Sequence, residues 1–191
     1  MVQRLLVLFF LSGVLFFSGC SLLPEPVYAE PAYYDLCSLD EKIPVQAGVG
    51  LRSFSDKTGN GTRMVSRSDD KVRVFFDEFN RFSSAPAQLV KRRLAASFEP
   101  VKNKKEDNVT VSGDLLRFEI LPGENKVRMV IDYQLHCGKK SRQVRYDLEE
   151  KITTSGPAAA AAGFEKCIIR SGRQLAGEIA VLIKESVRVK K

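Results

Sequence analysis

The chain has 191 residues, 44% of them hydrophobic and 28% charged, and its 30 basic and 23 acidic side chains give a formal net charge of +7. After loss of an N-terminal leader about 160 residues remain, which is enough to bury the core of one domain without extra staples. The basic surplus would suit a nucleic-acid-binding protein, but the export signal at the start of the chain excludes most roles of that class.

The chain begins with an apolar segment at residues 5–17, preceded by Arg4 and followed by Ser18 and Gly19. A helix over this segment is too short to cross the hydrocarbon core of a bilayer, which takes about twenty residues. A basic start, a short apolar middle and small residues at the exit are instead typical of a secretory signal peptide. We therefore predict that residues 1–19 are a signal that is removed on export.

The end of this segment, Phe17-Ser18-Gly19-Cys20, resembles the lipobox of bacterial lipoproteins. The resemblance implies cleavage before Cys20 and acylation of its sulfur and of the new amino terminus. Two or more acyl chains hold a protein firmly on a membrane, whereas a single one binds reversibly. In enterobacterial lipoproteins a residue other than aspartate after the cysteine, here Ser21, implies sorting to the outer membrane. The alternative is an ordinary cleaved signal with a coincidental cysteine.

Residues 20–32 contain Pro24, Pro26 and Pro31 and few periodic apolar residues. Such a segment has too little apolar surface to bury and is predicted to be an extended, lipidated tether. The mature chain keeps 29 basic and 23 acidic residues, a formal charge of +6. Residues 33–191 are predicted to form a single periplasmic α+β domain.

The first half of this domain contains two strand signals and one helix signal. Apolar residues alternate at Val45, Ala47, Val49 and Leu51, and residues 72–76 are rich in strand formers. A helix is predicted to begin near Ser84-Ala85-Pro86, with the serine as its cap and the proline in its first turn. The apolar residues of this helix recur every four positions, at Val90, Leu94 and Phe98.

A three-strand antiparallel meander is predicted downstream. In residues 127–137 every odd position is apolar and most even positions are polar, which is the pattern of a strand with one buried face. The strand before it changes phase beside Gly113, which indicates a β-bulge, and residues 144–152 alternate in the same way. Turn-forming sequences at 122–125 and 138–141 separate the three strands.

The last segment, from Pro157 towards Val187, returns to the helical period. Its apolar stripe consists of Phe164, Ile168, Leu175, Ile179 and Leu182. A helix with one apolar stripe has to cover another apolar face, and the meander offers one. The predicted fold class is therefore α+β, a mainly antiparallel sheet with two helices packed on one face.

The cysteines leave two alternatives open. With Cys20 acylated, Cys37, Cys137 and Cys167 remain, and one pair among them could form a disulfide in the oxidising periplasm. Cys137 and Cys167 fall on apolar positions of their elements, so two buried thiols without a bond are an equally good interpretation. The cysteine spacings do not fit a zinc site, and no metal site is predicted.

The sequence offers no constellation for catalysis. His136 is the only histidine and lies on the polar side of its strand, and no serine or cysteine has an evident basic partner. Gly59-Asn60-Gly61 lacks the lysine and hydroxyl residue of a phosphate-binding loop and is predicted to connect strands. We predict a protein that is not an enzyme, with no catalytic residues and no cofactor.

Two short motifs carry a family resemblance. Tyr33-Tyr34-Asp35-Leu36 follows the tether, and Arg81-Phe82 precedes Pro86 at the start of the first helix. With the order of elements, these motifs resemble the ABC-type transport auxiliary lipoproteins, the PqiC/YmbA-like family, in which tryptophan stands where this chain has Phe82. The resemblance covers nearly the whole mature chain.

The resemblance implies a non-enzymatic lipoprotein of the outer membrane that faces the periplasm. Its implied partners are an MCE-domain protein and the permease and ATPase of an ABC transporter, with phospholipid as the cargo class and no nucleic acid. Self-association into a homo-oligomer is left open. The rival interpretation is a structural or assembly lipoprotein that braces an outer-membrane protein or a secretion complex.

Two groups of residues are candidates for contact with these partners. Tyr33, Tyr34, Arg81 and Phe82 are candidates for partner or cargo contact, with the alternative that the tyrosines add a strand and the other two pack the start of the helix. A set of basic residues could approach anionic headgroups or form an ordinary solvated surface. These are Lys91, Arg92, Arg93, Lys102, Lys104, Lys105, Arg188, Lys190 and Lys191.

Overall fold

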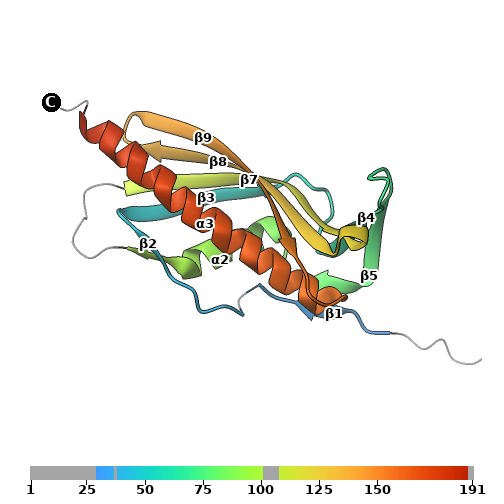
Figure 1. Ribbon diagram of the computed structural model, residues 1–191. Coiled ribbons are helices and arrows are strands. Elements are labelled where there is room, and N and C mark those ends of the chain that lie inside the picture. The colour runs from blue at the N-terminus through green and yellow to red at the C-terminus, as the bar shows by residue number, and fades with distance from the viewer. Residues whose placement is uncertain (1–28, 37, 101–107, 189–191) are drawn as a thin grey trace, which may run out of the picture. The chain divides into compact units, whose positions relative to one another are not determined.

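The computed structural model describes residues 29–36, 38–100 and 108–188 (Figure 1). The predicted signal segment, Cys20, Cys37 and the lysines at 102, 104, 105, 190 and 191 lie outside the described residues. All the elements that follow belong to one compact unit, Pro31–Lys191.

Nine strands and two helices are present in the described part of the chain, with a 3-10 turn at Pro122–Glu124. The strands are β1 (Ala32–Tyr34), β2 (Ile43–Val45), β3 (Gly48–Asp56), β4 (Arg63–Arg67), β5 (Val74–Phe82), β6 (Phe98–Pro100), β7 (Asn108–Leu121), β8 (Lys126–Cys137) and β9 (Lys140–Lys151). The helices are α2 (Pro86–Ser97) and α3 (Pro157–Arg188).

Seven of these strands form one mixed sheet in the order β1-β5-β4-β7-β8-β9, in which β3 also pairs with β7. The meander β7-β8-β9 is antiparallel, as is β4-β5, whereas β1-β5 and β3-β7 are parallel. The α+β class and the meander are confirmed, but the sheet is mixed rather than mainly antiparallel. The connection from β3 to β7 carries α2, and a crossover of that length with a helix brings the chain back in the same direction.

The bulge in β7 lies closer to its C-terminal half than the sequence indicates. The register with β8 shifts between Leu115 and Arg117, not beside Gly113. Gly113 has a different purpose, because a Cβ there would stand 3.0 Å from the ring of Phe54 on β3. The glycine makes room for an aromatic neighbour, and the extra residue Leu116 produces the change of phase.

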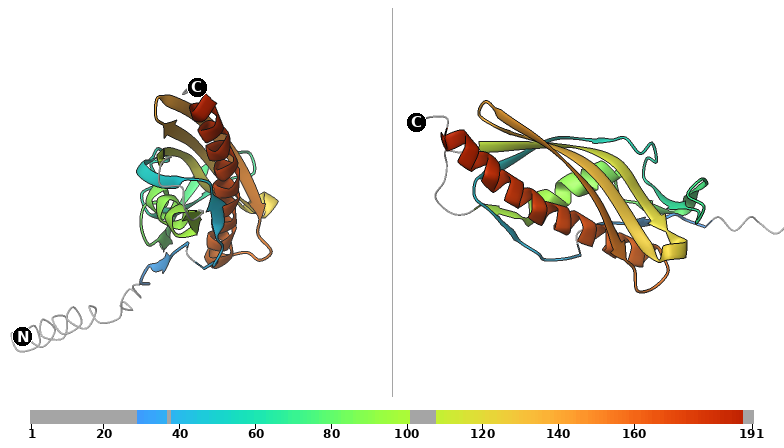
Figure 2. Two further views of the ribbon diagram at one scale, coloured as in Figure 1. Left: turned by 90° about the vertical axis from the view of Figure 1, so that its left-hand side faces the viewer. Right: turned by 45° about the horizontal axis from the view of Figure 1, so that its top comes forward.

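Both helices cover the same face of the sheet (Figure 2). Helix α3 packs on β8 and β9, helix α2 packs on β3 and β7, and the two helices contact each other. All five residues of the predicted α3 stripe are buried. Between helix and sheet, the rings of Phe118 and Phe164 stack with centroids 3.8 Å apart, and Phe82 lies edge-on to both at 5.3 and 5.9 Å.

Helix α2 begins and ends differently from the prediction. Its cap is Ala85, which makes no side-chain hydrogen bond, and Pro86 is in the first turn. Proline forces the residue before it into an extended conformation, so Ala85 takes the cap position and the predicted serine cap is wrong. At the other end Phe98 is extended and begins β6, which pairs in parallel with β2.

Two glycines of α3 differ in their surroundings, which gives a test of the packing between the helices. A Cβ at Gly172 would lie 2.8 Å from Ile43 and 2.9 Å from Leu94, whereas Gly177 has open space. Gly177→Ala should stabilise the fold by up to about 1 kcal/mol through helix propensity. Gly172→Ala should gain nothing or lose up to about 2 kcal/mol, because overpacking opposes the same gain. Chemical unfolding followed by circular dichroism measures both, and an equal gain in the two variants would contradict the close helix packing.

Candidate interaction surface

The structure brings the two sequence motifs together. Strand β1 pairs in parallel with β5, with Tyr33 opposite Arg81 and Tyr34 opposite Phe82. The chain immediately after β5 is joined to β1 as well, because the Ser83 amide donates a hydrogen bond to the Tyr34 carbonyl at 2.8 Å. Residues that are almost fifty positions apart in sequence therefore form one local unit at the edge of the sheet.

The four candidate contact residues do not share one environment. Phe82 is 1% exposed, and its ring packs on Phe118 of β7 and Phe164 of α3, so burial in the core contradicts its assignment to partner contact. Tyr34 is half-buried, and its hydroxyl donates to Asn80 at 3.3 Å. Tyr33 is 64% exposed, and Arg81 lies beside Glu78 on the surface. Tyr33 is therefore the one exposed side chain of the four, whereas Tyr34 and Arg81 are partly buried.

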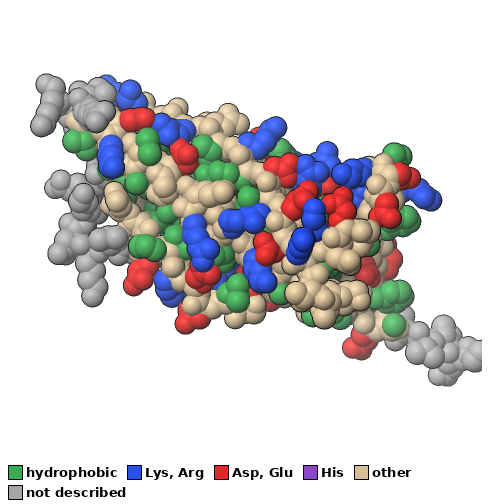
Figure 3. Space-filling model, in the orientation of Figure 1, with side chains coloured by type: hydrophobic (Ala, Val, Ile, Leu, Met, Phe, Trp, Pro, Cys, Tyr) green, Lys and Arg blue, Asp and Glu red, His purple; other side chains and the backbone are tan. Residues whose placement is uncertain are grey.

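Large exposed hydrophobic side chains occur along β5, from β1 at one end to the β4–β5 turn at the other. Nine such side chains occur in the described residues, and six of them lie on β1, β5 and the β4–β5 turn. We name these six the apolar hairpin surface: Tyr33, Val72, Val74, Phe75, Phe76 and Phe79. Hydrophobic side chains are visible at this end of the sheet in Figure 3, where the hairpin projects in Figure 1. This surface is not among the features predicted from the sequence.

A bulge in β5 exposes the side chain of Phe79. The register between β4 and β5 shifts between Arg63 and Val65, so β5 bulges over residues 77–80. The Asp77 carboxylate accepts hydrogen bonds from the amides of Phe79 and Asn80, both at 2.9 Å, and from the Asn80 side chain. Partial burial opposes ionisation, but these donors hold the pKa of Asp77 below its usual value. The bulge is thus fastened at its base while Phe79 stays 57% exposed.

Charges around the hairpin are balanced. The Arg63 guanidinium lies 4.3 Å from the centre of the Phe76 ring and 3.6 Å from Glu78, a carboxylate that is also paired with Arg81. At the turn, Arg73 pairs with Asp70 at 3.8 Å. The surface is therefore apolar with mixed charges at its rim, and it is not a cationic patch.

A buried ion pair ties the segment after β1 to both helices. Arg93 of α2 and Glu165 of α3 are 3% and 1% exposed, and Arg93 Nε lies 2.8 Å from Glu165 Oε1. The amides of Ser38 and Leu39 donate to the same carboxylate, and Arg93 donates to the Leu39 carbonyl at 2.5 Å. This network fixes the chain that leads away from β1.

These contacts also correct the prediction for the basic residues. Arg93 is buried and cannot reach a headgroup, and Arg92 pairs with Asp35 at 2.5 Å. Of the clusters named from the sequence, the ones after α2 and at the C terminus lie outside the described residues or, for Arg188, have an undescribed side chain. Of the α2 cluster, Arg93 is therefore removed from the surface, and Arg92 is engaged by an acidic neighbour.

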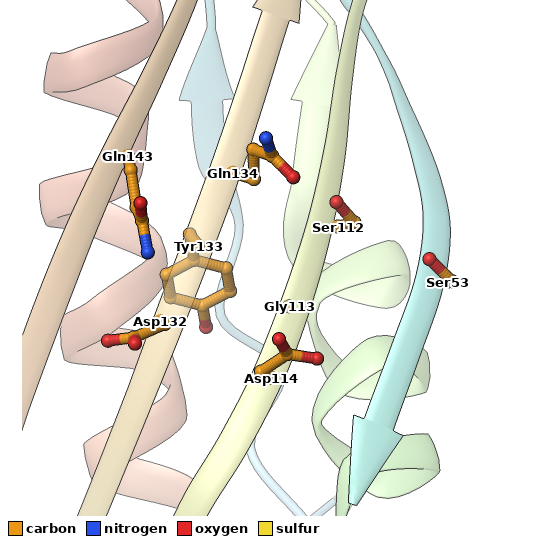
Figure 4. Close-up of a pocket in the computed structure, with 8 residues that line it drawn as sticks. All are labelled: Ser53, Ser112, Gly113, Asp114, Asp132, Tyr133, Gln134 and Gln143. Atoms are coloured by element: carbon orange, nitrogen blue, oxygen red, sulfur yellow. The ribbon is translucent and has the colours of Figure 1, made fainter.

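The face of the sheet that is turned away from the helices is polar. It carries an open hollow of about 240 Å³, whose lining includes Ser53, Ser112, Asp114, Asp132, Gln134 and Gln143 (Figure 4). Ser55 donates a hydrogen bond to Asp114, and Arg145 holds Asp132 through two bonds of 2.6 Å. His136 is exposed on this same side of β8, as predicted. Hydroxyls, amides and paired carboxylates make this a solvated surface.

The Asp132–Arg145 pair predicts a pH dependence. The Arg145 guanidinium beside Asp132 holds the pKa of that carboxyl below its usual value. Its stabilisation is present above the pKa of an unfolded aspartate, about 3.9, and is lost as pH falls through the lower folded pKa. Because Arg145 is mostly exposed, Arg145→Gln should lower the stability at pH 7 only slightly. Unfolding at pH 7 and pH 3 should show this cost shrinking below about pH 4, and a cost that does not change with pH would contradict the pairing.

The described cysteines are free thiols. Cys137 and Cys167 are both buried and unbonded, so the interpretation of two packed thiols holds for this pair, and Cys37 lies outside the described residues. Burial raises the pKa of the Cys167 thiol to about 12. Within the described ranges, no group of three metal-ligating side chains is close enough to hold an ion, and no helix has the length and apolar content to span a membrane.

Comparisons with known proteins show similarity in fold. No protein-family profile matches the chain, and no curated protein is similar to it in sequence. An uncharacterised protein of known structure aligns with a TM-score of 0.57 at 15% identity, over 78% of this chain and 99% of its own. A Xanthomonas campestris protein of family DUF330 aligns with a TM-score of 0.52 at 14% identity, over 86% of this chain and 99% of its own. At these identities the chain shares their fold.

Proposed function

We propose that the protein is a lipoprotein of the outer membrane, anchored through Cys20, that serves as a non-enzymatic auxiliary component of an ABC- and MCE-type system for lipid transport. The observation that carries the proposal is the register of β1 and β5, which sets Tyr33-Tyr34 beside Arg81-Phe82. These are the motifs on which the family resemblance rests. Because they pair with each other in the sheet, one structural feature accounts for the presence of both.

The fold supports the same proposal. DUF330, the family of the Xanthomonas campestris neighbour, is the PqiC/YmbA-like family. The proposed role needs a stable periplasmic domain with a protein-facing surface and a membrane-facing end, not a catalytic centre. The long α3 supplies rigidity between the two, because its 32 residues extend over about 48 Å.

The anchor is tested by acylation in cells. Wild-type protein should incorporate labelled palmitate and fractionate with the outer membrane, whereas Cys20→Ser should remain unlabelled and soluble in the periplasm. Labelling of the variant, or a soluble wild type, would show that the cysteine is coincidental to an ordinary signal.

The transport role is tested by purification from detergent-extracted membranes, followed by mass spectrometry of proteins and lipids. Recovery of an MCE-domain protein or transporter subunits supports the auxiliary role. Phospholipid that is enriched relative to an unrelated lipoprotein with the same type of anchor supports direct cargo contact. Recovery of only an outer-membrane barrel or a secretion subunit would overturn the transport role in favour of the bracing role.

A further inference from the structure

We infer that the apolar hairpin surface docks on the lipid bilayer that holds the anchor, so that side chains as well as acyl chains fix the protein at the membrane. The inference rests on the lipid anchor of the proposed function, but not on its transport partners. The proposed binding partner of this surface is a lipid bilayer. Binding of a second copy of the chain or of a protein partner would contradict the inference.

The apolar hairpin surface is exposed on both faces of β5. Phe75 and Phe76 are neighbours on β5, so their side chains point to opposite faces of the strand. They are nevertheless 52% and 42% exposed. A strand that packs on a partner sheet or helix needs one apolar face, whereas a hairpin that enters a bilayer interface meets lipid on both. Aromatic rings are also the side chains that favour the level of the headgroups.

The connection between the acylated position and β1 is short. Eleven residues, from Ser21 to Pro31, separate the acylated position from β1, so that the chain from Cys20 to Ala32 can span at most about 40 Å. They lead directly into β1, whose neighbour in the sheet is β5. The C-terminal end of α3 lies at the other end of the sheet from β1 (Figure 1). Docking through the hairpin therefore directs the end of α3 and the β8–β9 turn away from the bilayer.

The charged side chains at the rim of the surface are paired with opposite charges. Arg63 and Arg81 both lie beside Glu78, and Arg73 pairs with Asp70. Such a rim offers little net attraction to anionic lipid, so the affinity must come from buried apolar area. Binding to vesicles of uncharged phosphatidylcholine is expected to persist, unlike that of a polybasic segment.

The absence of tryptophan from the sequence provides a clean probe. Lipidated Phe79→Trp and Val181→Trp would be reconstituted into phosphatidylcholine vesicles with and without brominated acyl chains. Val181 on α3 is 43% exposed, which matches the hairpin residues, but it lies outside the hairpin surface. We expect blue-shifted, bromine-quenched emission for the first variant and water-exposed, unquenched emission for the second. Equal, unquenched emission from both would overturn the inference.

The contribution of the side chains is measured without the anchor. The core begins at Leu36 and is complete within Pro31–Lys191, so mature chain carrying Cys20→Ser folds without its acyl groups. Adding Phe75→Ser and Phe79→Ser should weaken cosedimentation with the vesicles at least about tenfold. Val181→Ser should leave it unchanged, and thermal unfolding checks that both variants are folded.

Two results would assign the surface elsewhere. If the emission of Phe79→Trp shifts with protein concentration in the absence of vesicles, the occupant is a second copy. If vesicle binding is absent but Phe75→Ser with Phe79→Ser abolishes recovery of the transport subunits, the occupant is a protein. Failure of the transport role alone leaves the vesicle results untouched, so the two proposals fail separately.

Discussion

Arg93→Ala should lower the free energy of unfolding by about 3–5 kcal/mol, because removing one member of a buried ion pair leaves the other charge without its partner. Glu165 is 1% exposed and would keep only the hydroxyl and the two amides of residues 38 and 39 as donors. Urea unfolding followed by far-ultraviolet circular dichroism measures the loss.

The neighbouring residue is the matched control. Arg92 is on the same helix and its replacement by alanine removes the same charge, but its ion pair with Asp35 is about half exposed on both sides. Arg92→Ala should therefore cost at most about 1 kcal/mol. Similar costs for the two variants would show that burial of the Arg93 pair is not what stabilises the fold.

A double-mutant cycle would separate the pair from its surroundings. Combining Arg93→Met with Glu165→Leu removes both charges, so the combined cost should be smaller than the sum of the two single costs. It should not fall to zero, because the amides of Ser38 and Leu39 lose their acceptor. The remaining cost measures how firmly the segment after β1 is held.

The parts of the fold that the sequence predicts are those with one buried and one solvated face. Strand β8 alternates because α3 covers one side and water the other, and α3 carries a stripe for the same reason. Each pattern follows from local periodicity alone. The bulge in β7 is also visible as a change of phase, but its position between Leu115 and Arg117 is set by the pairing with β8, which no local pattern reveals.

The parts that the sequence does not predict depend on distant partners. Parallel pairing of β1 with β5 joins residues on either side of three other strands. Arg93 sits among basic neighbours on α2, and Glu165 is 72 positions away, so neither looks buried in sequence. For the apolar hairpin surface a signal was present, because Val74, Phe75 and Phe76 are consecutive rather than alternating. Consecutive apolar residues normally indicate a strand buried on both sides, and here they lie at an exposed edge.

Phe82→Ala should also cost about 3–5 kcal/mol, since it removes a fully buried ring from a packed aromatic cluster. The ring contacts Phe118 and Phe164 edge-on, so the cavity would open where β5, β7 and α3 meet. The backbone at this position is held by the Phe82 amide, which donates to the Thr62 carbonyl at 2.7 Å. Thermal and urea unfolding measure the loss. A cost below about 1 kcal/mol would mean that the cluster closes around the cavity.

Tyr33→Ala is the counterpart of Phe82→Ala and separates the two functions of the paired motifs. Tyr33 is 64% exposed, so its loss should change stability by no more than about 0.5 kcal/mol. The variant is thus folded, and any loss of vesicle quenching or of copurified subunits must come from the surface itself. If Tyr33→Ala retains both while Phe82→Ala loses both through unfolding, the motifs are scaffold only. If Tyr33→Ala loses one of them at full stability, β1 belongs to the corresponding contact surface.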